Sequence, residues 1–227
     1  MNQPSVVGTT LDVQSFINAQ PLSRYQWRVV ILCFLIVFLD GLDTAAMGFI
    51  APALSQDWGI DRASLGPVMS AALIGMVFGA LGSGPLADRF GRKVVLVGAV
   101  LVFGAFSLAS AYSSNVDQLL VLRFLTGLGL GAGMPNATTL LSEYTPERHK
   151  SLLVTSMFCG FNLGMAGGGF ISAKLIPAFG WHSLLLIGGI LPLILTVVLW
   201  GWLPESARYL VVRNRGTDKV RDRKSVV

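Results

Sequence analysis

The sequence predicts an all-α integral membrane protein that crosses the bilayer with six transmembrane helices. Of the 227 residues, 53% are hydrophobic and only 13% are charged, whereas a soluble domain carries about 25% charged residues. Roughly 20 consecutive apolar residues are needed to cross the core of a bilayer, and the chain contains six such stretches. The loops between these stretches are short, so neighbouring helices are expected to run antiparallel.

The six predicted spans account for most of the chain. Their approximate bounds are Tyr25–Leu54, Ser64–Leu86, Val94–Tyr112, Asp117–Ser142, Ser151–Ala173 and Ser183–Leu203. They define a transmembrane bundle over residues 25–203, which is preceded by a tail, residues 1–24, and followed by a basic segment, residues 204–227.

The basic residues predict the orientation of this bundle. If the N-terminus is cytoplasmic, 14 of the 17 Lys and Arg residues fall on the inner side, as the positive-inside rule requires. The tail and the basic segment are then both cytoplasmic, and the net charge of +5 reflects topology rather than a nucleic-acid footprint. The inner residues are Arg24, Arg28, Arg89, Arg92, Lys93, Arg148, Lys150 and the seven from Arg208 to Lys224.

Two aspartates lie inside the first apolar span. Asp40 and Asp43 fall in Val29–Leu54, after 11 uncharged residues. An ionisable side chain at bilayer depth costs at least about 2.5–3.5 kcal/mol on insertion scales, so it is a functional-site hypothesis by default. The two carboxylates share one helical face at i, i+3, and in a dry site such a pair resists double ionisation. Gly41 between them either frees the backbone at the site or serves helix packing.

Arg123, in the fourth span, reaches a depth similar to that of Asp43. Asp43 lies 14 residues beyond Val29, about 21 Å at ~1.5 Å per residue. Arg123 lies six residues beyond Asp117, about 9 Å from the opposite boundary of a core ~30 Å thick. A contact of Arg123 with Asp40 or Asp43 is therefore allowed if the first and fourth helices face each other.

This charged cluster has two interpretations. In the first, Asp40 or Asp43 carries a proton, and Arg123 tunes it or binds a substrate carboxylate through bidentate hydrogen bonds. In the second, the cluster is a structural ion-pair network that only holds the two helices together. Apolar residues could do the same at no loss of stability, which favours the first interpretation.

Three further segments are patterned. GPLADRFGRK, Gly84–Lys93, predicts a tight reversal between the second and third spans, in which Gly91 takes positive φ. The fourth span carries Gly127 and Gly131 at a spacing that lets another helix approach closely. The sixth span ends at LPESARYL, Leu203–Leu210, where Pro204 stops the helix.

These three segments resemble, in order and spacing, the signatures of the major facilitator superfamily, and DGLDT in the first span resembles its aromatic acid:H⁺ symporters. The similarity is greatest to bacterial 4-hydroxybenzoate and protocatechuate carriers. It implies symport of small aromatic carboxylates with protons across the inner membrane. It also implies a gating loop of Gly84, Asp88, Arg89, Gly91 and Arg92, and a cytoplasmic motif of Glu143, Arg148, Pro204, Glu205 and Arg208.

The fifth span bears on the direction of coupling. GFNLGMAGGGF, Gly160–Phe170, follows the antiporter pattern G-x-x-x-G-P-x-G-G except that Met165 replaces its proline, which favours symport. Gly160 and Gly164 are also candidates for helix packing.

The resemblance further implies that this chain is half of a carrier. Members of the family have two six-helix bundles with the site between them, so the six spans correspond to the N-terminal half, built as two inverted three-helix repeats. A C-terminal bundle would be the missing partner. The alternatives are an inactive or partner-dependent fragment, or a carrier half for another substrate class such as sugars.

The sequence contains no phosphate loop, CxxC pair or nucleophile elbow. We therefore expect neither an enzyme nor a catalytic or metal site, and no cofactor other than a proton gradient as the source of energy.

Overall fold

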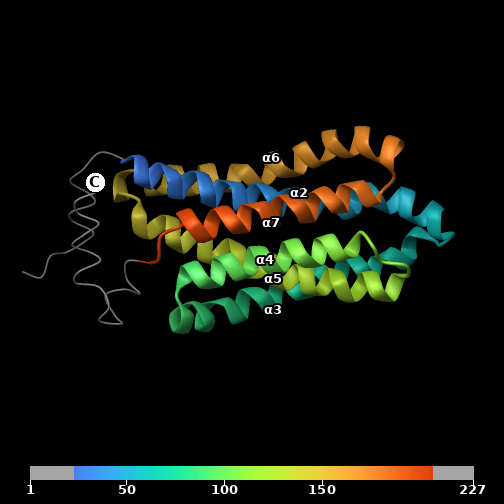
Figure 1. Cartoon of the computed structure of the whole chain (residues 1–227), viewed down its shortest axis with the longest axis horizontal. Helices are drawn as coiled ribbons and strands as arrows, with labels where there is room; N and C mark the ends of the chain where they lie inside the picture. The colour runs from blue at the N-terminus through green and yellow to red at the C-terminus, as the bar shows by residue number, and fades with distance from the viewer. Residues whose placement is uncertain (1–22, 207–227) are drawn as a thin grey trace, which may run out of the picture.

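The computed structural model describes residues 23–206, and within that range its secondary structure is entirely helical (Figure 1). The predicted tail up to residue 22, and the basic segment from residue 207 with Arg208, lie outside the described residues. Six of the described helices are long and apolar enough to cross a membrane, which confirms the predicted fold class. The elements are α2 Arg24–Trp58, η1 Arg62–Leu65, α3 Gly66–Phe90, α4 Arg92–Ser110, α5 Val116–Tyr144, α6 Glu147–Phe179 and α7 His182–Trp202.

Short polar signals mark the helix ends. Ser23 and Gln26 form a capping box at the start of α2, and the Asn115 side chain accepts a hydrogen bond from the backbone of Gln118 at the start of α5. Such caps satisfy backbone N–H groups that have no partner within the helix. Gly59 ends α2 in the left-handed region, with φ 63°.

The loop between the second and third spans is shorter than the sequence predicts. α3 continues through Asp88 and Arg89 to Phe90, and Gly91 alone joins it to α4. Hydropathy marks where the apolar core ends, whereas a helix continues into the polar region as long as its residues tolerate helical dihedrals. Gly91 does take positive φ, at 95°, as the sequence predicts for this reversal.

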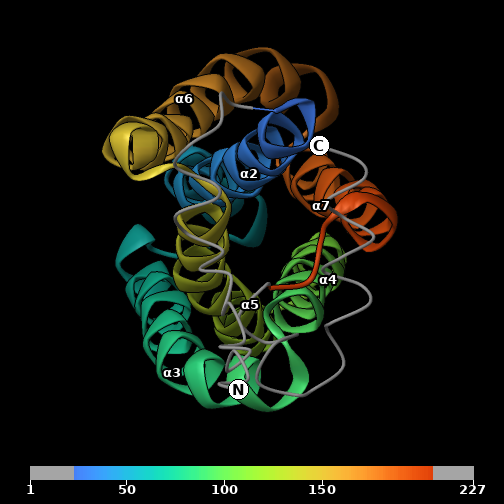
Figure 2. The same cartoon turned by 90° about the vertical axis from the view of Figure 1, so that its left-hand side faces the viewer.

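The helices pack in the pattern of two three-helix repeats, α2–α4 and α5–α7. The extensive pairings are α2 with α6 and α3 with α5, followed by α4 with α5 and α4 with α7. In the two repeats, α2 corresponds to α5 and α3 corresponds to α6. The α2–α6 interface is therefore the counterpart of the α5–α3 interface, and these are the two largest interfaces in the bundle. Viewed along the helices, α5 lies between α3 and α4, and α7 lies beside α2 and α4 (Figure 2).

Glycines let the backbones of these pairs touch. A Cβ atom at Gly127 or Gly131 of α5 would overlap the carbonyl oxygens of Ala72 and Met76 in α3. Gly75 of α3 meets the carbonyl of Phe124 in the same way. Small residues at this spacing permit the close approach that drives helix association in lipid.

The α2–α6 interface uses the same device. A Cβ atom at Gly41 would overlap the carbonyl oxygen of Phe161, and one at Gly164 would overlap that of Phe38. At Gly160 it would lie 3.1 Å from the Phe34 ring. Because α2 is one continuous helix through Gly41, the structure gives this residue the packing role and no freed backbone.

The buried apolar side chains form two separate clusters along the bundle. One contains Leu39 and Leu130, and the other contains Ala46 and Leu119. On α2 the interval between the clusters holds Asp40 and Asp43; on α5 it holds Arg123. A polar layer therefore divides the core.

We predict that Gly41→Ala lowers the melting temperature of the purified chain in detergent, followed by circular dichroism. The new methyl group would overlap the backbone of Phe161, and overpacking of this kind costs about 1–3 kcal/mol. Gly48→Ala on the same helix is the matched control, because no heavy atom of another described element lies within 4 Å of its added Cβ. Equal melting temperatures for the two variants would contradict backbone contact at Gly41.

Candidate functional site

The polar layer is centred on Asp43, whose carboxylate is reached from two other helices. The Nη1 atom of Arg123, on α5, lies 2.9 Å from Asp43 Oδ2, and both side chains are buried. The hydroxyl of Ser107, on α4, donates a 2.7 Å hydrogen bond to Asp43 Oδ1. Buried charges persist where they are paired and hydrogen-bonded. Asp43 therefore ties α2 to both α4 and α5.

A fourth helix closes the same site. A Cβ atom at Gly188, on α7, would lie 3.5 Å from both Asp43 Oδ1 and Ser107 Oγ. Because glycine adds no side chain there, α7 can cover the carboxylate without displacing its hydrogen bond. The site is thus enclosed by helices from both repeats.

Arg123 uses only part of its hydrogen-bonding capacity. Its Nη1 atom is paired with Asp43, while Nε and Nη2 are buried without a hydrogen-bond partner in the described part of the chain. A guanidinium group carries five N–H donors. The polar layer therefore holds spare buried donors beside a satisfied ion pair.

Asp40 lies one helical turn before Asp43 in a different setting. Its side chain is buried, and its Oδ1 atom accepts a 3.3 Å hydrogen bond from the hydroxyl of Thr44. Asp40 lines a small pocket with room for about one water molecule. The other lining residues are Ile36, Val100, Phe103, Gly129, Leu130 and Gly133.

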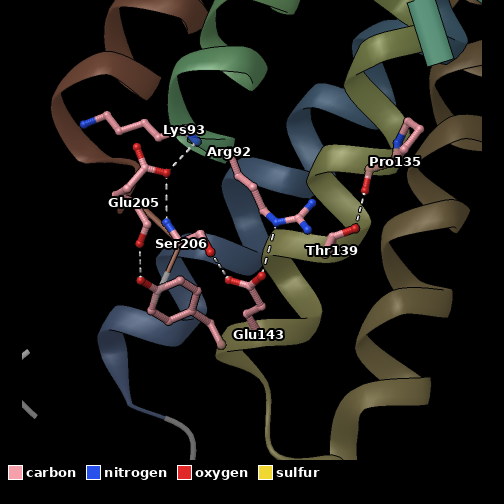
Figure 3. A network of polar contacts seen from close by, with 8 residues as sticks. Arg92, Lys93, Pro135, Thr139, Glu143, Glu205 and Ser206 are labelled. Atoms are coloured by element: carbon pink, nitrogen blue, oxygen red, sulfur yellow. Dashed lines mark hydrogen bonds and ion pairs between the residues drawn. The ribbon is translucent and has the colours of Figure 1, made fainter. Parts of the chain in front are cut away.

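A second polar cluster lies at the end of the bundle where α4 begins and α5 ends (Figure 3). Arg92 Nε lies 3.2 Å from Glu143 Oε1, and the hydroxyl of Ser206 donates a 2.6 Å hydrogen bond to Glu143 Oε2. The hydroxyl of Tyr144 donates to the main-chain carbonyl of Glu205 over 2.6 Å. We call these residues, with Lys93, the terminal network.

Glu205 in this network caps α4. Its Oε1 atom accepts 3.0 Å hydrogen bonds from the backbone N–H groups of Lys93 and Ser206. A carboxylate at a helix N-terminus satisfies free donors and complements the helix dipole. A Cβ atom at Gly91 would come within 2.7 Å of this carboxylate, so Gly91 both permits the turn and leaves space for the cap.

The other site residues predicted from the sequence fall into two groups, those in the terminal network and those exposed elsewhere. Arg92, Gly91, Glu143 and Glu205 meet in the terminal network, with Pro204 buried just after α7. The others are exposed residues: Gly84, Asp88 and Arg89 in the last two turns of α3, and Arg148 in the first turn of α6. Arg208 lies outside the described residues.

Sequence reasoning missed three residues that complete these clusters. Ser107 and Gly188 meet at Asp43, and Ser206 binds Glu143. Ser107 is a hydroxyl within an apolar helix, which is a weak signal by itself because serines can also bond to their own backbone. Nothing in the sequence specifies which carboxylate each of these residues meets.

The chain matches a known family across most of its length. The sequence profile of the Major Facilitator Superfamily matches residues 33–225. The inward-open structure of the xylose transporter XylE from E. coli superposes with a TM-score of 0.71 over 82% of this chain and 50% of that chain, at 21% identity. At this identity the likeness concerns the fold alone.

Two curated relatives from Pseudomonas putida are closer in sequence. The 4-hydroxybenzoate transporter PcaK is 89% identical over 222 residues, which are 97% of this chain and 50% of that protein. A gallate transporter is 55% identical over 214 residues, 94% of this chain and 48% of that protein. Both are transporters rather than enzymes, and the chain spans about half the length of each.

We predict that Arg123→Gln destabilises the chain by about 3–5 kcal/mol, because it leaves Asp43 as an uncompensated buried charge. The double variant Asp43→Asn/Arg123→Gln should recover most of that loss, since no charge then remains in the pair. Chemical unfolding of the purified chain in detergent measures both, with exposed Arg62→Gln as the control. Losses that simply add in the double variant would rule out coupling between the two side chains.

Proposed function

The chain belongs to the major facilitator superfamily, and from this premise we propose that it is the N-terminal half of a proton-coupled carrier of aromatic acids. 4-Hydroxybenzoate is the proposed substrate, because the P. putida transporter of that compound is the relative with 89% identity. The proposal places the half in the bacterial inner membrane with both its termini cytoplasmic, as the distribution of basic residues indicates.

The observation that carries the coupling mechanism is the unequal pairing of the two aspartates. Asp43 is balanced by the guanidinium of Arg123, whereas Asp40 accepts a hydrogen bond from the uncharged hydroxyl of Thr44. Gain or loss of a proton at Asp40 therefore changes the net charge of the layer. Buried ionisable groups that face a cavity are the usual proton sites of membrane carriers, and Asp40 lines one.

Of the two roles open to Arg123, its burial supports tuning. The side chain is only 1% exposed and already holds Asp43 through Nη1, and its spare Nε and Nη2 donors are buried, so a substrate carboxylate cannot reach them from outside the half in this conformation. An arginine stays charged under all ordinary conditions. Arg123 thus provides a fixed positive charge beside the proton site in this conformation.

The rest of the carrier would pack on helices that this chain leaves uncovered. α3 and α6 are the least buried of the membrane-length helices, and they expose large apolar side chains such as Phe78 and Phe170. Transport by rocking requires a second bundle against which the first can move. The terminal network and the exposed end of α3, with Gly84, Asp88 and Arg89, form the proposed gating region.

The second candidate is an inactive or partner-dependent half. The chain spans about half the length of each relative, and transport by rocking requires a second bundle. A sugar carrier half has no comparable support, because the likeness to the xylose transporter concerns the fold alone.

A chimaera tests the site. This chain, joined to the C-terminal half of the P. putida 4-hydroxybenzoate transporter, should accumulate labelled 4-hydroxybenzoate in cells, and an uncoupler should abolish the accumulation. Asp40→Asn should reduce concentrative uptake by at least about tenfold, because the amide binds no proton. The amount of the variant protein in the membrane should stay normal, because the amide preserves the side-chain volume. Exposed Asp117→Asn is the matched control. Uncoupler-sensitive accumulation by Asp40→Asn would show that Asp40 is not the proton site.

The 227-residue chain by itself should insert in the membrane but take up no 4-hydroxybenzoate. Without a second bundle against which the first can move, alternating access is impossible. Co-expression with the separate C-terminal half of the P. putida transporter should restore uptake. Uptake by the chain in proteoliposomes, above that of empty vesicles, would contradict the assignment as a half.

A further inference from the structure

α7 ends in an exposed aromatic patch. Trp200 and Trp202 are 65% and 67% exposed. Among the described residues, no heavy atom from another part of the chain lies within 4 Å of the position that a Cβ atom on Gly201 would take. Two exposed indoles thus stand on either side of an uncovered glycine at the end of a membrane-length helix. Tryptophan is favoured at this depth because its ring is amphipathic and suits the headgroup region.

Each indole is paired with a cation from a different helix. Arg28 Cζ, on α2, lies 6.0 Å from the centre of the Trp202 ring, and Lys93 Nζ, on α4, lies 6.0 Å from that of Trp200. Figure 2 shows α7 beside both α2 and α4, and in Figure 3 the side chain of Lys93 extends toward α7. Residues distant in the sequence therefore bring two positive charges to the two sides of Gly201.

The acidic side chain of Glu205, shortly after α7, is already engaged. The Glu205 carboxylate binds the backbone N–H groups of Lys93 and Ser206, so its charge serves the start of α4. Arg24, one turn before Arg28 on α2, is also exposed. The charge at this patch is therefore predominantly positive.

An apolar track continues from the patch along α7. Val197, Ile194 and Ile190 lie four, seven and eleven residues before Gly201 and share its helical face. Their side chains are 75%, 57% and 45% exposed. A ligand that fits the whole surface has an anionic head and a long apolar tail, which excludes free phosphate, nucleic acid and a charged peptide.

We propose that this surface binds one anionic phospholipid, with its phosphate between Arg28 and Lys93, its glycerol region over Gly201 and an acyl chain along Val197, Ile194 and Ile190. Arg28 donates to the phosphate from a planar guanidinium, while Lys93 acts as a point charge. The two indoles flank the headgroup. The site goes beyond the proposed function, because it does not depend on which substrate, if any, is carried.

Native mass spectrometry of the purified chain in nonionic detergent tests the site. Palmitoyl-oleoyl phosphatidylglycerol is titrated against the phosphatidylcholine of the same chains, with inorganic phosphate as a separate competitor. We expect a single preferred phosphatidylglycerol adduct that phosphate does not displace. Arg28→Gln and Lys93→Gln should each weaken it by about fivefold, since each removes one cation from the anionic headgroup.

Two variants separate this site from general charge attraction. Gly201→Leu fills the uncovered surface at Gly201 without changing charge and should also lose the adduct. Arg62→Gln/Lys174→Gln removes two cations from the ends of other helices and should not. The proposal is overturned if phosphatidylcholine binds equally well, if Gly201→Leu binds normally, or if the control pair weakens binding as much as Arg28→Gln/Lys93→Gln. Circular dichroism of each variant verifies that it is folded.

Discussion

The packing of the bundle centre depends on one constraint, the need to pair a charge that the bilayer core cannot solvate. Asp43 sits where four helices meet, and its carboxylate is satisfied by Arg123 and Ser107 together. Removing either partner would leave a buried polar group without compensation, which costs far more than the intact pair contributes. We infer that the pair acts mainly by favouring one arrangement, in which these faces of α2, α4 and α5 point inward. The two apolar clusters pack on either side of it.

Glycine interfaces and the terminal network extend this order to the rest of the bundle. α2 lies backbone to backbone on α6, and α5 lies so on α3, because Gly41, Gly164, Gly127 and Gly131 add no side chain between them. At one end, Glu143 and Glu205 connect α4 and α5 to the residues that follow α7. Specific contacts therefore hold the bundle at its interfaces, its middle and one end, and under our proposal they keep the half together as it moves against a second bundle.

The sequence predicts the number and order of the helices because length and hydropathy are local properties. The depth of Asp43 and Arg123 follows from the constant helical rise, so their meeting was foreseeable. The sequence does not predict which aspartate Arg123 binds. A depth estimate does not fix the rotation of a helix about its axis, and Asp40 and Asp43 lie within one turn of each other. Ser107, Gly188 and Ser206 escape prediction for the same reason: each acquires its role from a helix distant in the sequence.

Under our proposal the two interpretations of the charged cluster apply to different carboxylates. Asp43 and Arg123 form a buried ion pair, whose charges cancel, and we assign it the structural role. Asp40, with Thr44 and a cavity the size of one water beside it, carries the variable charge under our proposal. Because Arg123 remains positive, the layer is neutral when Asp40 holds a proton and carries one negative charge when it does not. Closing a bilayer-depth cavity around a net charge is costly, so protonation of one residue would be linked to the conformational state of the whole carrier. The fixed pair makes that link specific, because it leaves a single group whose charge can change.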